Sequence, residues 1–363
     1  MKIILDTFYD YTENVFEDEY SRNIIGGSWI SLLYKSAKKD GIQVVLGKRY
    51  LQENNISAND LIFSEGHTII SEKLISTGAT PFIIYSGESP NVDWKFYLFI
   101  KYYTKRYKHA ILFSGIKPFV YKKTQLHFFN WPNNIADARR NDVKSTTNPG
   151  RKLIMIVSNK KQHSTSAANA KYAIAKQVLM RIITKIAPQL NLIDLYSARM
   201  DAIRFFSQKE YFNLFGKGWD STDNLTVEEK QAVSKLQPVG ITDKLSLLQN
   251  YDFALCFENC IYPGYVTEKI FDCFLSGCIP IYYGDQNITD YIPSNTFIVG
   301  SSFENFNQLS VYLQQITKSE IVAYKNNIKQ FLASDEFEKY TDVKFCENLL
   351  SIVKQHVLVG EDK

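Results

Sequence analysis

Short apolar runs alternate with helical patterns along the first part of the chain. The runs predict strand, helix, strand, strand, helix and strand, in that order, over Ile3–Leu5, Trp29–Ala37, Val44–Leu46, Asp60–Phe63, Ile69–Ser76 and Pro81–Tyr85. A helix over Lys95–Tyr107 and a strand over His109–Ser114 continue the series. Strands that alternate with helices through short connections predict an α/β domain with a parallel sheet.

The periodicity is lost over Phe119–Lys152, a stretch that contains Trp131, Pro132, Pro149 and Gly150, and it then resumes. Strands are predicted at Leu153–Asn159, Tyr211–Phe215 and Phe253–Phe257, and helices at Ser166–Ile186, Leu195–Phe206, Leu245–Leu248, Asn305–Ile316, Glu320–Leu332 and Val343–Val357. Since one domain usually holds about 100–200 residues, 363 residues suit two. We expect domains at 1–150, with a linker from about 119, and at 151–363.

Composition narrows the class of protein. The chain is 45% hydrophobic and 22% charged, as in globular proteins, and its net charge of +4 is too small to indicate nucleic-acid binding. This net charge is compatible with an anionic ligand or with peripheral contact with a membrane surface. The first twenty residues show no signal peptide or anchor, because Asp6 interrupts their short apolar run. We therefore expect a cytoplasmic protein with five reduced cysteines. Peripheral binding to the inner face of the membrane is compatible with this expectation.

Several candidate ligand-binding residues lie close together in "FENCIYPGYVTEKIFDCFLSGCIPIYYG", residues 257–284. Glu258 and Asn259 follow a buried strand, and open α/β sheets bind ligands at the carboxyl ends of their strands. A helix over 267–276 would begin there, so its amino terminus and Lys269 can attract a phosphate, while Glu268 can accept hydrogen bonds from sugar hydroxyls. The alternative is an ordinary helix capped by Thr267, with a solvated Glu-Lys pair. The residues alone do not decide between the two.

The same stretch, extended back to "YDFALC" and followed by "DYIPSNTFI", resembles the donor-binding signature of the α-1,3/4-fucosyltransferases, glycosyltransferase family 10. The resemblance continues more weakly through "LIMIVSNKK", "LYSARMDAIRFFSQKEYFNLFGKGW" and "YSGESPN". It implies the GT-B fold, in which two Rossmann-like domains face each other across a cleft and the carboxyl-terminal one holds GDP-fucose.

The resemblance also implies roles for single residues. Asn259 and Tyr265 would line the nucleotide and ribose part of the donor site, Glu268 would hold donor hydroxyls, and Lys269 and Arg199 would contact the diphosphate. Because Gln162–Pro188 looks like an insertion, Arg181 or Arg204 could be confused with Arg199. On the amino-terminal domain, Glu88 matches the proposed general base, and Asp93 is its nearest rival.

The implied activity is an inverting transfer of L-fucose from GDP-β-L-fucose to a hydroxyl of an N-acetylglucosamine or glucose unit of a glycan, α-1,3 rather than α-1,4, as in lipopolysaccharide or protein glycosylation. No cofactor or metal is expected. The alternatives are a GT-B transferase for another GDP-sugar and a non-catalytic nucleotide-sugar-binding protein. The acceptor site could draw on aromatic residues of the amino-terminal domain, namely Phe8, Tyr9, Tyr11, Trp29 and Phe128–Trp131. The alternative, more common for such residues, is that they belong to the core.

Overall fold

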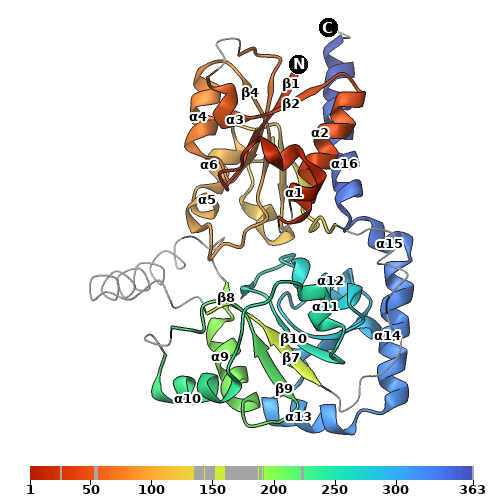
Figure 1. The fold of residues 1–363 in the computed structure, drawn as a ribbon. Coiled ribbons are helices and arrows are strands. Elements are labelled where there is room, and N and C mark those ends of the chain that lie inside the picture. The colour runs from red at the N-terminus through yellow and green to blue at the C-terminus, as the bar shows by residue number, and fades with distance from the viewer. Residues whose placement is uncertain are drawn as a thin grey trace. The chain divides into compact units, whose positions relative to one another are not determined.

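The computed structural model describes residues 1–24, 27–52, 56–134, 143, 152–159, 187, 190, 192–221 and 225–361. The chain forms two compact units, the first made of Met1–Ile135 with Asp335–Lys363 and the second of Ala136–Ser334 (Figure 1). The predicted long helix over Ser166–Ile186 lies outside the described residues.

The first unit is built on a parallel sheet in the order β2-β1-β3-β4-β5-β6. The strands are β1 Lys2–Asp6, β2 Gln43–Leu46, β3 Leu61–Glu65, β4 Thr80–Tyr85, β5 His109–Leu112 and β6 Gln125–Phe128. The strand order reverses between β1 and β3, and such a switch point opens a crevice at the carboxyl ends of the two strands. Asp6 and Glu65, the last residues of these strands, lie at that edge.

Helices cover the faces of the first sheet. They are α1 Asp18–Arg22, α2 Ser28–Lys39, α3 Gly47–Tyr50, α4 Ile69–Ser76, α5 Trp94–Leu98, α6 Ile100–Thr104, α15 Asp335–Glu338 and α16 Asp342–Glu361, with 3-10 turns at Glu13–Phe16 and Ser114–Phe119. Figure 1 shows α16 beside α2, at opposite ends of the colour scale.

The contact between α2 and α16 joins the two ends of the chain. The Trp29 and Phe345 rings lie 5.3 Å apart, and the Cys346 thiol donates to the Trp29 carbonyl at 3.0 Å. Residues 335–363 therefore belong to the first unit, whereas the predicted division assigned them to the second. That assignment was wrong for this segment because an amphipathic pattern shows that a helix has a buried face, not which sheet the face covers.

The second unit repeats the same topology. Its five-stranded parallel sheet has the order β13-β12-β10-β7-β9, so the switch point lies between β7 and β10. The strands are β7 Leu153–Ile156, β9 Phe212–Phe215, β10 Phe253–Phe257, β12 Ile279–Tyr283 and β13 Ile298–Val299, and β8 Ile193–Asp194 pairs separately with β11 Cys260–Ile261. Every residue of β10 is buried, as expected for a central parallel strand.

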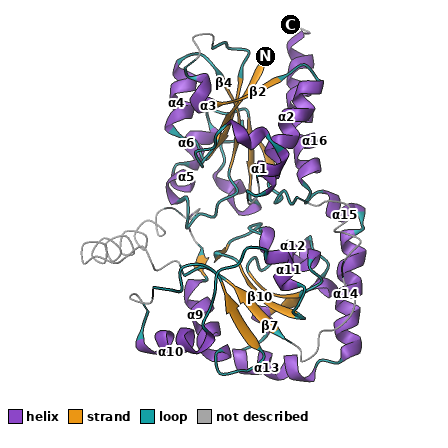
Figure 2. Cartoon of the chain, in the orientation of Figure 1, coloured by secondary structure: helices purple, strands orange, loops and turns teal. Residues whose placement is uncertain are grey.

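The helices of the second unit are α9 Tyr196–Phe206, α10 Val227–Leu236, α11 Lys244–Leu248, α12 Glu268–Leu275, α13 Phe306–Gln315 and α14 Lys318–Leu332, with 3-10 turns at Ile288–Asp290, Ser294–Thr296 and Gly300–Ser302 (Figure 2). Helix α12 buries Ile270, Phe271 and Phe274 completely. This packing fixes the helix against β10 and β12, and with it the direction of its first turn.

Most predicted elements are confirmed within two or three residues, and the exceptions have physical causes. The predicted helix over Lys95–Tyr107 divides at Phe99 into α5 and α6. Strand β6 escaped prediction because it is an edge strand whose residues are only partly buried or exposed. Within the described part of the chain, none of the helices is long and apolar enough to cross a bilayer.

Candidate functional site

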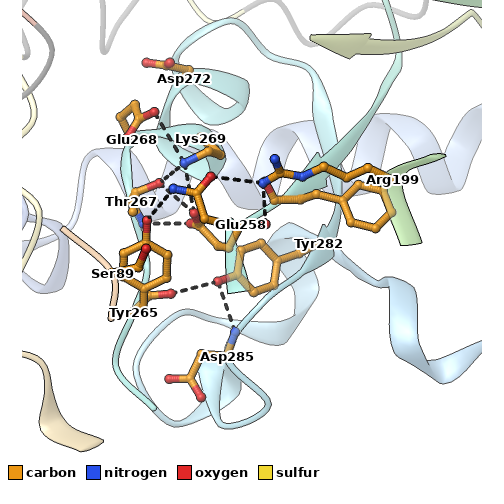
Figure 3. A network of polar contacts seen from close by, with 12 residues as sticks. Ser89, Arg199, Glu258, Tyr265, Thr267, Glu268, Lys269, Asp272, Tyr282 and Asp285 are labelled. Carbon is orange, nitrogen blue, oxygen red and sulfur yellow. Dashed lines mark hydrogen bonds and ion pairs between the residues drawn. The ribbon is translucent and has the colours of Figure 1, made fainter. Parts of the chain in front are cut away.

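The centre of the site in the second unit is Glu258, the residue that follows β10. Its side chain is fully buried, and its carboxylate accepts hydrogen bonds from the Thr267 backbone N–H and the Thr267 hydroxyl, both at 2.8 Å. The Lys269 ammonium is a third partner at 3.0 Å. A buried carboxylate is stable only with such compensation, so the strand end and the start of α12 are fixed to each other (Figure 3).

Lys269 lies in the first turn of α12 and has three protein partners. Its Nζ contacts the Thr267 hydroxyl at 2.7 Å and pairs with Glu268 at 3.5 Å, besides its bond to Glu258. Burial alone would lower the pKa of Lys269, but the carboxylates of Glu258 and Glu268 outweigh it, and the net effect is a raised pKa. A quarter of the side chain stays exposed (25%), and its raised pKa keeps the ammonium charged at neutral pH.

Thr267 occupies the N-cap position of α12 without capping the helix through its side chain. Its hydroxyl donates to Glu258 instead of accepting from a backbone N–H of the first turn. The alternative of an ordinary capped helix with a solvated Glu-Lys pair therefore does not describe this helix start. The positive end of the helix dipole and Lys269 lie together at the carboxyl edge of the sheet, an arrangement that favours anions.

Arg199, from α9, reaches the same strand end and is buried, with only 4% of its surface exposed. Its Nη2 donates to the carbonyl oxygens of Phe257 and Glu258 and, at 3.2 Å, to Oδ1 of Asn259. Burial lowers the pKa of the guanidinium, although nearby acidic groups oppose this. Its buried Nε has no hydrogen-bond partner among the described residues. Arg199 is thus a buried part of the site.

The two other arginines considered for the diphosphate differ from Arg199. Arg204 pairs with Asp201 on the surface of the same helix, and its side chain is 38% exposed. Arg181 lies outside the described residues. Among Arg199 and Arg204, only the former is bonded to the carboxyl end of β10.

Asn259 and Tyr265 complete the edge. Asn259 accepts from Arg199 through Oδ1 and donates through Nδ2 to the Tyr265 hydroxyl at 3.1 Å. Tyr265 is only 2% exposed. In this structure Tyr265 therefore holds the Asn259 amide in place, and the contacts of both residues with a nucleotide stay predictions.

Glu268, the first residue of α12, joins the network through its ion pair with Lys269. Burial tends to raise its pKa, but Lys269 and Lys244 together leave the pKa below its usual value. Lys244 itself forms an ion pair with Asp272 at 2.7 Å. Glu268 is therefore ionised at neutral pH, and both of its carboxylate oxygens can accept hydrogen bonds from sugar hydroxyls.

The loop after β12 shapes the turn that leads into α12. The buried carboxylate of Asp285 accepts from the backbone N–H groups of Gly264 and Asn287 at 2.6 and 3.0 Å, and the Tyr291 hydroxyl also contacts it. Gly284 allows the close approach, since a Cβ there would lie 2.2 Å from the Tyr282 hydroxyl and 2.8 Å from Cγ of Glu258. No larger residue fits without displacing Glu258.

The structure thus brings Arg199, Asn259, Tyr265, Glu268 and Lys269 into one network, and Glu258 at its centre was not among the predicted site residues. The available signal was its place directly after a five-residue apolar strand. Among the described residues, no group of three or more His, Cys, Asp or Glu could hold a metal ion, and all five cysteines are buried thiols. The contacts that these residues make with a donor stay predictions.

Glu88, the predicted base, lies in the first unit, just beyond the carboxyl end of β4. The Tyr9 hydroxyl donates to its Oε1 at 2.8 Å, and the Tyr97 hydroxyl donates to its backbone carbonyl at 2.8 Å. Its rival Asp93 caps α5 by accepting from the Phe96 N–H at 3.4 Å. A Cβ on Gly66, whose φ is +75°, would lie 2.9 Å from the Asp93 carboxylate, so this glycine lets Asp93 approach the end of β3.

Glu65, at the end of β3, is a further acid that the motifs did not reveal. Burial, with smaller contributions from Glu88, Asp6 and Asp93, raises its pKa to about 7. Burial and the charge of Glu88 likewise raise the pKa of Asp93 to about 6. Acids at this edge therefore face other acids, and their protons exchange near neutral pH.

The aromatic residues proposed for the acceptor site divide by burial. Phe8, Tyr9 and Phe128 are 43%, 49% and 53% exposed. Trp29 is 4% exposed and packs between Tyr85 and Phe345. Of the two alternatives for Trp29, a sugar-binding surface and the core, the structure shows the core.

Comparison with known proteins finds relatives of the carboxyl-terminal part of the chain. Residues 193–357 match the model of the glycosyltransferase family 10 (fucosyltransferase) C-terminal region. An alpha-(1,4)-fucosyltransferase of Arabidopsis thaliana is 38% identical over 19% of this chain and 17% of its own length. The 4-galactosyl-N-acetylglucosaminide 3-alpha-L-fucosyltransferase 9 of Bos taurus is 30% identical over 30% of this chain and 36% of its own length. The alignments thus span well under half of these relatives.

Solved structures extend the likeness to nearly the whole chain at the level of fold. An alpha1,3-fucosyltransferase with GDP has a TM-score of 0.50 and 17% identity and covers 97% of this chain and 90% of its own. Anabaena Alr3699/HepE in complex with UDP and glucose has a TM-score of 0.54 and 10% identity and covers 98% and 100%. The predicted GT-B class, two Rossmann-like α/β domains, is confirmed. Residues 193–357, which include much of the second unit and part of the carboxyl-terminal segment of the first, thus resemble the C-terminal region of the glycosyltransferase family 10 fucosyltransferases.

Proposed function

We propose that the chain is an inverting fucosyltransferase that moves L-fucose from GDP-β-L-fucose to a hydroxyl of an N-acetylglucosamine or glucose unit of a glycan. One observation carries the proposal. The residues that match the family 10 model include all five of the predicted donor-site residues, and these form a single hydrogen-bonded network at the carboxyl edge of a doubly wound sheet. Sites for nucleotide ligands form at such edges.

The donor half of the proposal is electrostatic. A nucleoside diphosphate carries negative charge, and Lys269 offers a charged ammonium at the first turn of α12, with the helix dipole beside it. Arg199 holds the end of β10 in place and adds a second positive charge. Glu268 is ionised next to Lys269 and can accept hydrogen bonds from sugar hydroxyls.

In the proposed chemical step, Glu88 acts as the general base. The acceptor hydroxyl oxygen forms a bond to the anomeric carbon of fucose as the bond from that carbon to the β-phosphate oxygen breaks. The electron pair leaves with GDP, the anomeric configuration inverts, and the acceptor proton passes to the Glu88 carboxylate. Glu88 then returns the proton to water, so one base supports successive turnovers.

Turnover is proposed to need no tightly bound metal. Lys269, the terminus of α12 and Arg199 supply positive charge for the leaving diphosphate. Incubation with a chelator followed by removal of the chelator should leave the transfer rate unchanged. A rate that disappears and returns only with added metal would contradict this.

The finer points of the substrate belong to the proposal as well. We propose an α-1,3 linkage rather than an α-1,4 linkage. We also propose peripheral contact at the inner face of the membrane, since the exposed residues Lys101 and Lys105 lie in α6 and directly after it. A glycan array incubated with GDP-fucose would identify the acceptor. Vesicle sedimentation with anionic and neutral lipids would test the location.

The decisive experiment measures GDP release from GDP-fucose with and without acceptor. We expect release that rises with 4-galactosyl-N-acetylglucosaminide or another glycan and yields fucosylated product by mass spectrometry. GDP-fucose binding without turnover on any acceptor of the array would instead indicate a nucleotide-sugar-binding protein. Turnover with another GDP-deoxyhexose and not with GDP-fucose would indicate a transferase of different donor specificity.

A further inference from the structure

The loop that follows β1 reaches the proposed base. It leaves the sheet at Asp6, at the switch point between β1 and β3, where doubly wound sheets bind ligands. The Tyr9 hydroxyl in this loop donates to Oε1 of Glu88 at 2.8 Å, across 79 positions of sequence. This hydrogen bond fixes one oxygen of the carboxylate and therefore the direction of the other.

The loop is held by its own contacts. The Phe8 N–H donates to Glu65 Oε2 at 3.1 Å, and the Thr7 hydroxyl donates to the Tyr9 carbonyl at 2.7 Å. Asp10 forms an ion pair with Lys48 at 2.8 Å. Tyr9 is thus placed next to Glu88 by bonds on both sides of it, so little ordering is left to occur when a substrate arrives.

Two aromatic rings of the loop face solvent at the same place. Phe8 is 43% and Tyr9 49% exposed, and their ring centroids are 5.2 Å apart in an edge-to-face arrangement. Exposed aromatic rings beside a polar group suit ligands with one apolar and one polar side. A hexopyranose is such a ligand, because its C–H groups form an apolar face while its hydroxyls point outward.

We propose that Tyr9 is a positioning residue for Glu88 and that Tyr9 and Phe8 form the surface on which the acceptor sugar ring stacks; this rests on the proposed fucosyl transfer. The Tyr9 hydroxyl holds Oε1 of Glu88, so Oε2 receives the proton of the attacking acceptor hydroxyl. Tyr9 itself exchanges no proton. Burial and the neighbouring Glu88 raise the pKa of the Tyr9 phenol, so it remains a hydrogen-bond donor at neutral pH.

Tyr9→Phe separates the hydroxyl from the ring. We expect kcat to fall roughly tenfold, the effect of losing one hydrogen bond to a charged group, while KM for the acceptor and Kd for GDP stay within about twofold. Tyr102→Phe is the matched control: it removes the hydroxyl of a tyrosine that is 59% exposed on α6, and it should leave both constants unchanged.

Phe8→Ala tests the stacking surface. It should raise KM for the acceptor roughly threefold to tenfold, the range expected for one partly exposed aromatic contact, and leave kcat at saturating acceptor near the wild-type value. Saturation-transfer NMR with 4-galactosyl-N-acetylglucosaminide and GDP gives a readout that needs no turnover: the ring protons of the bound sugar should lose signal in Phe8→Ala. Circular dichroism and GDP binding show whether each variant is folded.

The outcomes separate this inference from the proposed function. Wild-type protein that transfers no fucose to any acceptor refutes the proposed function, and with it the positioning role. Wild-type protein that transfers fucose, with Tyr9→Phe equally fast, keeps the proposed function and overturns the positioning role. Sugar binding by saturation transfer that is equal in Phe8→Ala and wild type overturns the stacking surface in either case.

Discussion

The two units share one topology and carry opposite chemistry at the same edge. Both sheets are parallel and reverse their strand order once, between β1 and β3 in the first unit and between β7 and β10 in the second. In the second unit, Glu258 faces Lys269 and Asp272 faces Lys244. In the first unit, the charged groups that act on Glu65 are Glu88, Asp6 and Asp93, all of them acids.

The difference shows how a fold leaves chemistry to a few residues after its strands. At the second edge, the pKa of Lys269 is raised and that of Glu268 is lowered, so both side chains stay charged at neutral pH, which suits the binding of a diphosphate and its sugar. Acids that face acids exchange protons near neutral pH, with pKa values of about 7 for Glu65 and about 6 for Asp93. Under the proposed function, the second edge binds the donor and the first carries Glu88, the proposed base.

The largest expected effect tests the first edge. Glu88→Gln keeps the size and the hydrogen-bonding reach of the side chain but removes its basicity, so transfer should fall by roughly a hundredfold to ten-thousandfold. GDP-fucose affinity by calorimetry should stay unchanged. Asp93→Asn is the matched control, because Asp93 caps α5 and should affect stability by about 1 kcal/mol rather than turnover. Near wild-type transfer in Glu88→Gln, with a loss in Asp93→Asn, would make Asp93 the base.

The next effect tests the paired charges of the second edge. Lys269→Ala leaves the fully buried Glu258 without its cation, so the free energy of unfolding should fall by about 3–5 kcal/mol. GDP affinity should fall about tenfold to a hundredfold. The double variant Glu258→Gln, Lys269→Ala should recover much of the stability but none of the GDP affinity. A double variant that binds GDP like the wild type would leave Lys269 a purely structural role.

A smaller effect distinguishes two arginines of α9. The lysine of Arg199→Lys is shorter and lacks the planar guanidinium, so its ammonium does not reach the position of Nη2 and its three acceptors. Stability should fall by about 1–3 kcal/mol, and GDP affinity should fall with it. Arg204→Lys, at an exposed pair with Asp201, should change stability by under about 1 kcal/mol. Equal GDP affinities in the two variants would remove Arg199 from the diphosphate site.

The smallest effect concerns Glu65 and pH. Its pKa is about 7 in the folded chain and near 4.5 when unfolded, so the folded state binds the proton more tightly. Between those values, stability should therefore fall as pH rises, by roughly 1–3 kcal/mol. Glu65→Gln should melt like the wild type near pH 5 and at a higher temperature near pH 8. Parallel melting curves at both pH values, as expected for the exposed Glu347→Gln, would mean that Glu65 is an ordinary surface acid.

Hydrophobic patterns predicted many of the strands and helices, because each such pattern lies within one segment of the sequence. The strand at Phe253–Phe257 is found at the predicted residues, and α12 lies within the predicted range 267–276. Both were predictable because an apolar run and an amphipathic pattern are each visible within a single segment of sequence. The ion pair of Lys269 with Glu258 forms only when the strand, the turn and the helix are all in place. The spacing of the two residues in the sequence therefore does not predict this ion pair. Glu65 shows the same limit: only the neighbours brought by the fold make a lone glutamate a titrating group.

The return of the last helix to the first unit affects the order in which the protein is made. Helix α16 packs beside α2, and its Phe345 and Cys346 contact Trp29 of α2. A ribosome completes the sheet of the first unit long before it synthesises residues 342–361. Until then, Trp29 in the nascent first unit lacks its partners on α16, and transiently exposed apolar surface of this kind is what makes chaperones useful during translation.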